Sequence, residues 1–226
     1  MRAGGRGRLE WIDLRLEKTY GPPPCLQREE PLTALVKTIL SQNTSGVNSS
    51  RAFRALKEAF PEWRSVLDAD KAAIEQVLRP GGLAKTKARR IQAILRQVAA
   101  TGTLSLDSLN SLPDDEAERY LLAFDGVGYK TARCVLLFAM GRDVFPIDTH
   151  VQRVLKRMGV VPEGLSAERA HEVLGPAVPR GRALALHVNL IRHGREVCHP
   201  RVPACQACCL RELCACGADG VTPSSP

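Results

Sequence analysis

Residues 121–132 read Leu-Leu-Ala-Phe-Asp-Gly-Val-Gly-Tyr-Lys-Thr-Ala and predict two helices joined by a tight Gly-x-Gly turn. Glycine at both turn positions permits a positive φ and a close approach of another molecule to the backbone. The backbone N–H groups of Gly126, Val127 and Gly128 precede the second helix, where they suit a phosphate oxygen. This helix-hairpin-helix pattern is typical of proteins that hold a nucleic-acid backbone without reading its sequence. For this motif taken alone, an ordinary helix–glycine–helix turn is the alternative.

The second helix of this hairpin carries a lysine, and an aspartate follows it along the chain. Lys130 lies just inside that helix, and Asp148 comes eighteen positions later in Phe-Pro-Ile-Asp-Thr-His. Taken singly, Lys130 predicts a phosphate contact or a solvated group, and Asp148 predicts a helix N-cap. As a pair they can do covalent chemistry, because a desolvated lysine forms Schiff bases with carbonyl carbons and a carboxylate stabilises a cationic sugar. Lys130 and Asp148 are therefore the candidate catalytic residues.

A group of closely spaced cysteines follows in the pattern C-x6-C-x2-C-x5-C. Its members are Cys198, Cys205, Cys208 and Cys214. Clustered thiols predict either disulfides or a metal site with four thiolate ligands. The spacing alone leaves an iron–sulfur cluster and a structural zinc about equally open. Cys209 and Cys216 lie close enough to serve as alternative ligands.

The rest of the chain disfavours disulfides. No apolar core of secretory length follows the basic, Gly-rich start, and no segment approaches the roughly 18 apolar residues of a membrane span. We therefore expect a cytoplasmic protein whose thiols stay reduced. The isolated Cys25 and Cys134 are expected to be small buried apolar residues.

Composition limits the class of protein. The 226 residues suffice for one large domain or two small ones, and 44% hydrophobic residues are typical of a globular protein. The net charge of +8 and a pI near 9.3 favour a polyanionic partner such as nucleic acid. Only 4% of residues are aromatic, which argues against the stacking surfaces of single-strand-binding proteins.

Helical periodicity recurs along the chain. Residues 32, 35, 36, 39 and 40 are apolar, as are residues 91, 94, 95 and 98. The wholly apolar run 134–140 predicts a central helix, and Pro-Gly-Gly at 80–82 separates two helices. Ser111, followed by proline and two aspartates, predicts an N-cap. We expect an all-α fold of about ten short helices, with a disordered basic N-terminal arm and a disordered tail from Gly220 to Pro226.

In this order and spacing, the hairpin, lysine, aspartate and cysteines resemble the endonuclease III family of DNA glycosylases. The likeness runs from about Pro31 to Cys214 and includes Ile-Asp-Thr-His at 147–150 and His-Gly-Arg at 193–195. It implies a two-domain helix-hairpin-helix glycosylase fold with DNA between the domains. Residues 30–142 would form a six-helix barrel, and residues 1–29 with 143–226 a cluster domain. The resemblance also implies a 4Fe–4S cluster, rather than zinc, on the four cysteines.

The resemblance gives each candidate a role. Lys130 would attack C1′ of a damaged nucleotide flipped out of the duplex, and the resulting imine permits β-elimination 3′ to the lesion. Asp148 would help to activate the lysine and offset the positive charge on the sugar. Adenine-glycosylase and thymine-mismatch branches lack this lysine, so Lys130 favours a bifunctional DNA glycosylase and AP lyase acting on oxidised pyrimidines. The implied partner is double-stranded DNA with a damaged base or an abasic site, bound by a monomer in a bacterial or archaeal cytoplasm, at the nucleoid.

Further DNA contacts are implied by the same resemblance. Gln42 would fill the gap left by the flipped base, and Leu83 would act as an apolar wedge. Lys87, with its basic neighbours Lys85, Arg89 and Arg90, would grip phosphates. Without the resemblance, Gln42 predicts a solvated helix end, Leu83 a loop residue covering the core, and the basic residues a solvated face.

Two departures from the family pattern leave alternatives open. Asp125 stands in the hairpin where the family usually has proline, and its charge opposes phosphate binding. The segment Ser-Gln-Asn-Thr-Ser at 41–45 replaces the commoner Ser-Ala-Gln-Ala-Thr-Asp. The alternatives are a glycosylase directed at mismatches or uracil, and a non-catalytic protein that binds damaged DNA.

Overall fold

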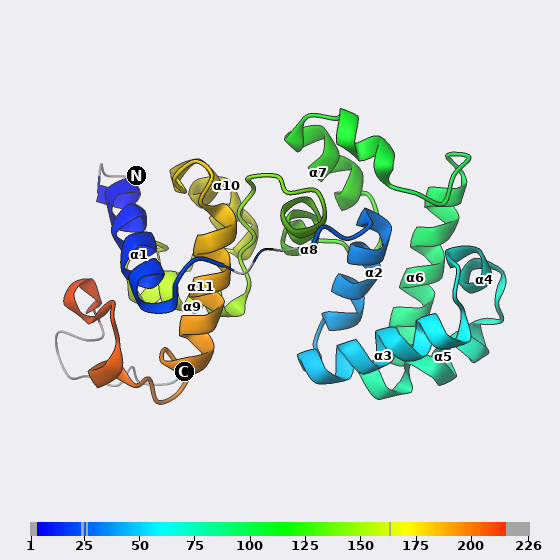
Figure 1. Cartoon of the computed structure of the whole chain (residues 1–226), viewed down its shortest axis with the longest axis horizontal. Coiled ribbons are helices and arrows are strands. Elements are labelled where there is room, and N and C mark those ends of the chain that lie inside the picture. The colour runs from blue at the N-terminus through cyan, green and yellow to red at the C-terminus, as the bar shows by residue number, and fades with distance from the viewer. Residues whose placement is uncertain (1–3, 24, 26, 163, 216–226) are drawn as a thin grey trace. The chain divides into compact units, whose positions relative to one another are not determined.

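The computed structural model describes residues 4–23, 25, 27–162 and 164–215, and every regular element in these ranges is helical (Figure 1). The chain divides into two compact units. The central unit comprises residues 27–142, and the terminal unit comprises residues 1–26 and 143–226. The first boundary lies three residues before the one predicted from the sequence, because residues 27–29 group with the central unit. No helix of the described residues combines the length and apolar character that crossing a bilayer requires.

The central unit is built around α2 (Pro31–Ser41). This helix contacts α3 (Gly46–Ala59), α6 (Ala84–Ala99), α8 (Tyr129–Cys134) and the π-helical segment η3 (Val135–Ala139). The Glu30 carboxylate accepts hydrogen bonds from the N–H groups of Leu32 and Thr33, and Pro31 occupies the first turn. All five apolar positions predicted for its buried face, residues 32, 35, 36, 39 and 40, are fully buried. The periodicity is therefore confirmed for this helix.

Six more α-helices complete the central unit in the described residues. They are α3 (Gly46–Ala59), α4 (Trp63–Asp68), α5 (Lys71–Leu78), α6 (Ala84–Ala99), α7 (Asp114–Leu122) and α8 (Tyr129–Cys134). The predicted break at Pro80–Gly82 falls in the short 3-10 segment η1 (Arg79–Gly81) and the turn before α6. The predicted cap at Ser111 is wrong: Ser111 ends the 3-10 segment η2 (Asp107–Ser111), and α7 starts at Asp114 behind Pro113.

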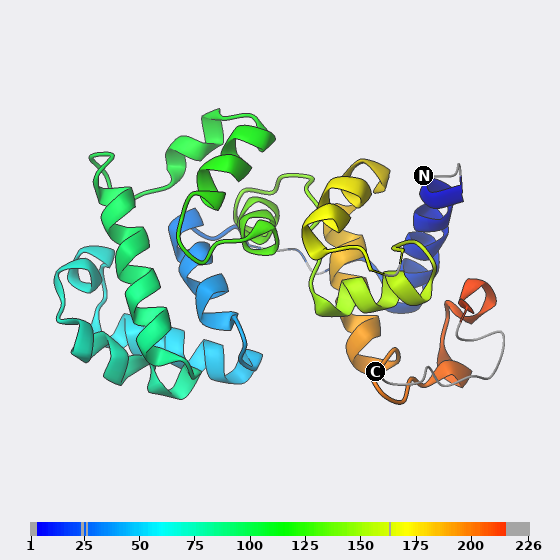
Figure 2. The ribbon, with the colours of Figure 1, turned by 180° about the vertical axis from the view of Figure 1, so that it is seen from behind.

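The terminal unit joins segments from both ends of the sequence. Its helices are α1 (Gly4–Tyr20), α9 (Thr149–Arg157), α10 (Ala167–Leu174) and α11 (Ala183–Glu196). Helix α11 packs against both α1 and α9, and the two views show α1 beside α11 (Figures 1 and 2). Asp13 is nearly buried and accepts a hydrogen bond of 2.6 Å from Arg182 Nε. The Nη2 atom of the same arginine lies 2.8 Å from the Glu17 carboxylate.

The predicted disorder of the N-terminal arm is wrong from Gly4 onward. The weak helix propensity of the glycines is outweighed by burial, because Leu9, Ile12 and Leu16 are fully buried along one face of α1. The predicted disordered tail lies outside the described residues. Cys134 is buried as predicted, whereas Cys25 is exposed.

Lys87 corrects a prediction about DNA contacts. Its side chain is only 2% exposed, and its ammonium donates to the carbonyls of Leu40 (2.7 Å) and Gly81 (2.9 Å). Burial lowers the pKa of Lys87 below its usual value. The charge pattern of α6 suggested a solvated basic face, but this position points inward, where it ties together α2, η1 and α6. Lys87 is therefore unavailable to a phosphate.

The variant Lys87→Met tests whether the hydrogen bonds of the Lys87 ammonium hold α2, η1 and α6 together. The variant leaves two buried carbonyls without their donor, so we expect the free energy of unfolding in urea to fall by about 1–3 kcal/mol. The matched control is Lys85→Met on the exposed side of α6, which should change that free energy by less than about 0.5 kcal/mol. Equal stability of Lys87→Met and the unchanged protein would contradict a role for the ammonium in holding these segments.

Candidate functional site

The predicted hairpin is formed by α7, a turn and α8. Gly126 has a φ of +80°, and Gly128 precedes α8 without any side-chain cap on the first turn of that helix. The turn is closed by a hydrogen bond of 3.1 Å from Val127 N–H to the Phe124 carbonyl, and both side chains are buried beneath it. The N–H groups at the start of α8 therefore remain available to a bound anion.

A hydrogen-bond network connects this turn to the end of α2. The Gln42 amide nitrogen donates to the Gly126 carbonyl (3.0 Å) and lies 3.3 Å from the Thr131 hydroxyl. Arg90 Nη1 donates to the Gln42 amide oxygen (3.1 Å). A Cβ at Gly126 would clash with Arg90 Nε, so this position requires glycine both for its positive φ and for the close approach of Arg90. Sequence reasoning missed this link, because Gln42 and Arg90 approach each other only in the tertiary structure.

The two candidate catalytic residues lie at the starts of helices. Lys130 is half-buried on the first turn of α8 in the central unit, where its ammonium bonds to no described residue of that unit. Asp148 belongs to the terminal unit and caps α9, with Oδ1 accepting from Val151 N–H at 2.8 Å. The N-cap predicted for Asp148 is therefore confirmed. Thr131, which follows Lys130 in the sequence, is the residue of α8 that contacts the Gln42 amide nitrogen.

Leu83 has an unusual backbone and an exposed side chain. It has a φ of +51° at the start of α6, directly after Gly82 with a φ of +65°. A left-handed conformation costs a branched residue about 1–2 kcal/mol. The side chain is 55% exposed, so it does not cover the core. The strained turn instead holds an apolar group out in solvent.

The remaining basic residues near this turn differ in whether they pair with another described side chain. Arg89 Nη2 lies 3.1 Å from the Asp125 carboxylate, and both side chains are more than half exposed. The negative charge that Asp125 brings to the hairpin is thus matched locally. Arg90 is committed to Gln42, whereas Lys85 is exposed. Of the four basic residues Lys85, Lys87, Arg89 and Arg90, only Lys85 is exposed and forms no hydrogen bond or ion pair with the described residues.

The four spaced cysteines line one cavity of the terminal unit. These cysteines are Cys198, Cys205, Cys208 and Cys214, and the other lining residues are Arg157, Val197, Pro203 and Ala204. No three Cys, His, Asp or Glu side chains of the described residues stand at metal-binding distances. The fit to a metal centre therefore rests on donor type and enclosure. Cys209 is not among the lining residues, and Cys216 lies outside the described part of the chain.

Two of these sulfur atoms meet nitrogen donors. Arg157 Nη1 donates to Cys198 Sγ at 3.2 Å, and His193 Nε2 lies 3.5 Å from Cys208 Sγ. Burial lowers the pKa of His193 to about 4 and raises the pKa of Cys208 to about 11. The imidazole is therefore neutral, and its Nδ1 lies 2.9 Å from the Tyr20 hydroxyl. Burial therefore favours the protonated thiol of Cys208, so binding of a metal at this position has to displace that proton.

Comparisons with known proteins agree with this geometry. Residues 36–178 match the family model of the HhH-GPD superfamily base excision DNA repair proteins. A putative DNA glycosylase of Arabidopsis thaliana is 40% identical over 170 residues, covering 75% of this chain but only 58% of the relative. Endonuclease III of Sulfolobus acidocaldarius is 31% identical over 192 residues, covering 84% of each chain.

A solved structure gives the same answer. The structure of a trapped endonuclease III–DNA covalent intermediate superposes with a TM-score of 0.82 at 26% identity, covering 94% of this chain and 96% of the other. The hairpin, the helix-borne lysine and the cysteine cavity thus occur in a chain whose sequence and fold match the same group of proteins. The chain belongs to the HhH-GPD superfamily of base excision DNA repair proteins and, within it, to the endonuclease III family of glycosylases.

Proposed function

We propose that this base-excision-repair DNA glycosylase and AP lyase acts on oxidised pyrimidines in duplex DNA, with Lys130 as its nucleophile. The observation that carries the proposal is the position of Lys130. It lies on the first turn of α8, directly behind a turn whose N–H groups suit a DNA phosphate, and its amine is bonded to no described residue of the central unit.

The chemistry follows from an amine beside a sugar. The Lys130 nitrogen attacks C1′ and loses a proton, while the C1′–base bond breaks and its electron pair leaves with the base. The sugar ring opens to an imine, with O4′ taking up a proton. The imine makes the C2′ proton acidic, so its removal expels the 3′ phosphate. Water then hydrolyses the imine and restores the lysine.

Asp148 would supply negative charge to this reaction. A carboxylate stabilises the cationic character that grows on the sugar as the base departs, and it can accept the proton that activates the lysine. Its hydrogen bond to Val151 N–H fixes the direction of the side chain.

DNA binding would use groups whose geometry supports it. The hairpin N–H groups and the exposed Lys85 would hold phosphates, in line with the net charge of +8. Leu83 would enter the base stack from its exposed turn. Gln42 would fill the vacated space by exchanging its bonds to Gly126 and Arg90 for bonds to the unpaired base. We propose further that the protein acts as a monomer in the cytoplasm, associated with the nucleoid.

The cysteine cavity would hold a 4Fe–4S cluster through Cys198, Cys205, Cys208 and Cys214. Bound there, the cluster would cross-link the loop of residues 198–214 and so stabilise the terminal unit. Arg157 would donate to the Cys198 sulfur and His193 to the Cys208 sulfur. Tyr20 would fix the orientation of the His193 ring.

The non-catalytic alternative loses its main support. It relied on the charge of Asp125 in the hairpin, and Arg89 offsets that charge at 3.1 Å. The segment at 41–45 still differs from the family pattern, so mismatched and deaminated bases belong in any substrate test.

Borohydride trapping on labelled duplexes tests the role of Lys130. We expect a covalent adduct with thymine glycol and with an abasic site, because borohydride reduces the imine to a stable amine, and none with Lys130→Gln. Uracil and G·T duplexes should give less adduct than thymine glycol. Base release without any adduct would make the enzyme hydrolytic, and trapping strongest on G·T or uracil would favour the mismatch-directed reading.

The pair Asp148→Asn and Asp148→Ala separates capping from catalysis. Asparagine caps a helix as well as aspartate does, so Asp148→Asn should keep the free energy of unfolding within about 0.5 kcal/mol. Its single-turnover rate of base release should fall on the order of 100-fold, because the negative charge is gone. Asp148→Ala should lose activity and about 1 kcal/mol of stability. Full activity in Asp148→Asn would assign the residue to capping alone.

Cys205→Ser tests the cluster. Loss of one thiolate ligand should remove the visible absorbance and iron content of the purified protein and lower its soluble yield. The control is Cys25→Ser, since Cys25 is exposed and does not line the cavity. If the unchanged protein is colourless and stable and contains zinc, the cysteines hold zinc and not a 4Fe–4S cluster.

A further inference from the structure

Val47 is more exposed than any other large hydrophobic side chain of the described residues, with 78% of its surface accessible. It lies on the first turn of α3, after Gly46 and the N-cap Ser45. Local structure does not account for a valine there, because branched side chains are weak helix formers and the first turn of a helix favours acidic groups. An isolated exposed valine is nonetheless ordinary on a protein surface, so its surroundings decide whether it has a role.

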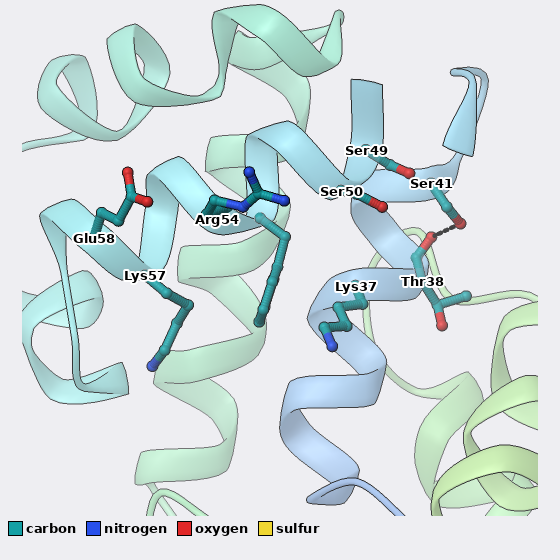
Figure 3. Close-up of a pocket in the computed structure, with 9 residues that line it drawn as sticks. Lys37, Thr38, Ser41, Ser49, Ser50, Arg54, Lys57 and Glu58 are labelled. Carbon is teal, nitrogen blue, oxygen red and sulfur yellow. Dashed lines mark hydrogen bonds between the residues drawn. The ribbon is translucent and has the colours of Figure 1, made fainter. Parts of the chain in front are cut away.

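The remainder of α3 has two committed faces. Ala52 and Leu56 are fully buried in the core of the central unit. A second face is turned toward α2 and lines the pocket between these two helices (Figure 3); its members are Ser49, Ser50, Phe53, Arg54, Lys57 and Glu58. Val47 belongs to neither face. It stands instead at the start of the helix, beside the turn that leads from α2.

The start of α3 is packed against the turn that carries Leu83. Gly81 approaches α3 so closely that a Cβ there would clash with the Ala52 methyl group, and it would lie 3.9 Å from the Asn48 carbonyl oxygen. Asn48 is the residue after Val47, and Leu83 is the second residue after Gly81. A tight contact between α3 and the turn before α6 therefore carries two exposed apolar side chains, one on each segment.

The end of α2 joins the same contact. The buried ammonium of Lys87 donates to the carbonyls of Gly81 and Leu40, and Gln42 follows two residues after Leu40. The turn before α3 and the turn before α6 are thus held together through the core. We call these two turns, residues 42–47 and 79–83, the turn edge.

Backbone strain is concentrated on the turn edge. Asn43 has a φ of +52° and Leu83 a φ of +51°, and the described part of the chain has no other non-glycine residue with a positive φ. A left-handed backbone is unfavourable for residues that carry a side chain, and such strain gathers at functional sites. The stability of the fold does not explain why both strained residues lie here.

Charge indicates which molecule covers the turn edge. Residues 41–57 and 79–90 contain no aspartate or glutamate, whereas each range contains several lysines and arginines. Such a surface attracts the polyanionic backbone of DNA. The turn edge also adjoins the hairpin, because Gln42 bonds to the Gly126 carbonyl at 3.0 Å. Duplex DNA held at the hairpin is therefore the partner that this edge suits.

We propose that Val47, together with Leu83, covers the face of the unpaired base opposite the lesion and selects a purine there by its size. This rests on the proposed function, in which Gln42 and Leu83 enter the duplex. Aliphatic side chains have no donor or acceptor, so they do not distinguish adenine from guanine. A purine offers them a larger apolar ring face than a pyrimidine does. Because pyrimidines pair with purines, this contact matches the base that an oxidised pyrimidine leaves unpaired.

The test measures binding of the full-length protein and of Val47→Ala to labelled duplexes that carry a tetrahydrofuran abasic analogue opposite each of the four bases. We expect the unchanged protein to bind the two purine duplexes within about twofold of each other, and several-fold more tightly than the pyrimidine duplexes. Val47→Ala should weaken binding opposite purines by about 3- to 10-fold, because it removes two methyl groups from the contact. Binding opposite pyrimidines should change less.

Three controls isolate the contact with the base. A duplex with the analogue on both strands offers no base to Val47, so Val47→Ala and the unchanged protein should bind it equally. Val47→Ile restores the apolar area and should bind the purine duplexes at least as tightly as the unchanged protein does. Leu14→Ala removes an apolar group that is 65% exposed on α1, in the terminal unit, and should leave every affinity unchanged.

Three results would overturn the proposal. Equal weakening on every duplex, including the one without a base opposite the analogue, would place Val47 on the sugar–phosphate backbone. No weakening by Val47→Ala would remove this residue from the interface, and equal affinities of the unchanged protein for purine and pyrimidine duplexes would remove the selection by size. Because the binding assay needs no catalysis, a protein that selects purines but forms no borohydride adduct would keep the contact at Val47 and overturn the proposed function instead.

Discussion

A single buried ammonium group fixes the geometry on which the candidate site depends. Burying a charge costs several kcal/mol unless hydrogen bonds satisfy it, and Lys87 finds its acceptors at Leu40 and Gly81. Leu40 lies near the end of α2, two residues before Gln42. Because Gln42 holds the hairpin turn at Gly126, the position of α8 follows from that of α2. The helix that carries Lys130, the proposed nucleophile, is thus connected to the core through a chain of polar contacts.

The terminal unit uses the same physical device. Asp13 of α1 is nearly buried, and Arg182 at the start of α11 satisfies it at 2.6 Å. At the end of α1, the Tyr20 hydroxyl contacts His193 Nδ1, and His193 Nε2 contacts the Cys208 sulfur. The surroundings of the cysteine cavity are therefore shaped by a helix that lies far away in the sequence. In both units, hydrogen bonds of polar side chains fix the relative positions of segments that apolar packing alone would hold less firmly.

Features set by local chemistry could be predicted from the sequence. The 3.6-residue periodicity located α2, and the Gly-x-Gly run located the hairpin. The carboxylate of Asp148, which follows an apolar stretch, located the start of α9. Features set by tertiary contacts could not. Nothing in the basic stretch Lys-Thr-Lys-Ala-Arg-Arg at 85–90 distinguishes Lys87, whose partners lie on two other segments. The left-handed backbone of Leu83 also depends on its surroundings, because a branched residue does not favour that conformation on its own.

The union of distant segments in the terminal unit has a consequence for biosynthesis. Helix α1 leaves the ribosome early, but α11, against which it packs, follows only after the intervening residues 21–182 have been made. At typical translation speeds this delay is roughly 10–30 s. The central unit is complete before then, because it comprises residues 27–142. During that interval the apolar face of α1 lacks α11, the helix with which it makes its most extensive contact, so nascent chains of this protein are candidates for chaperone protection at their leading helix.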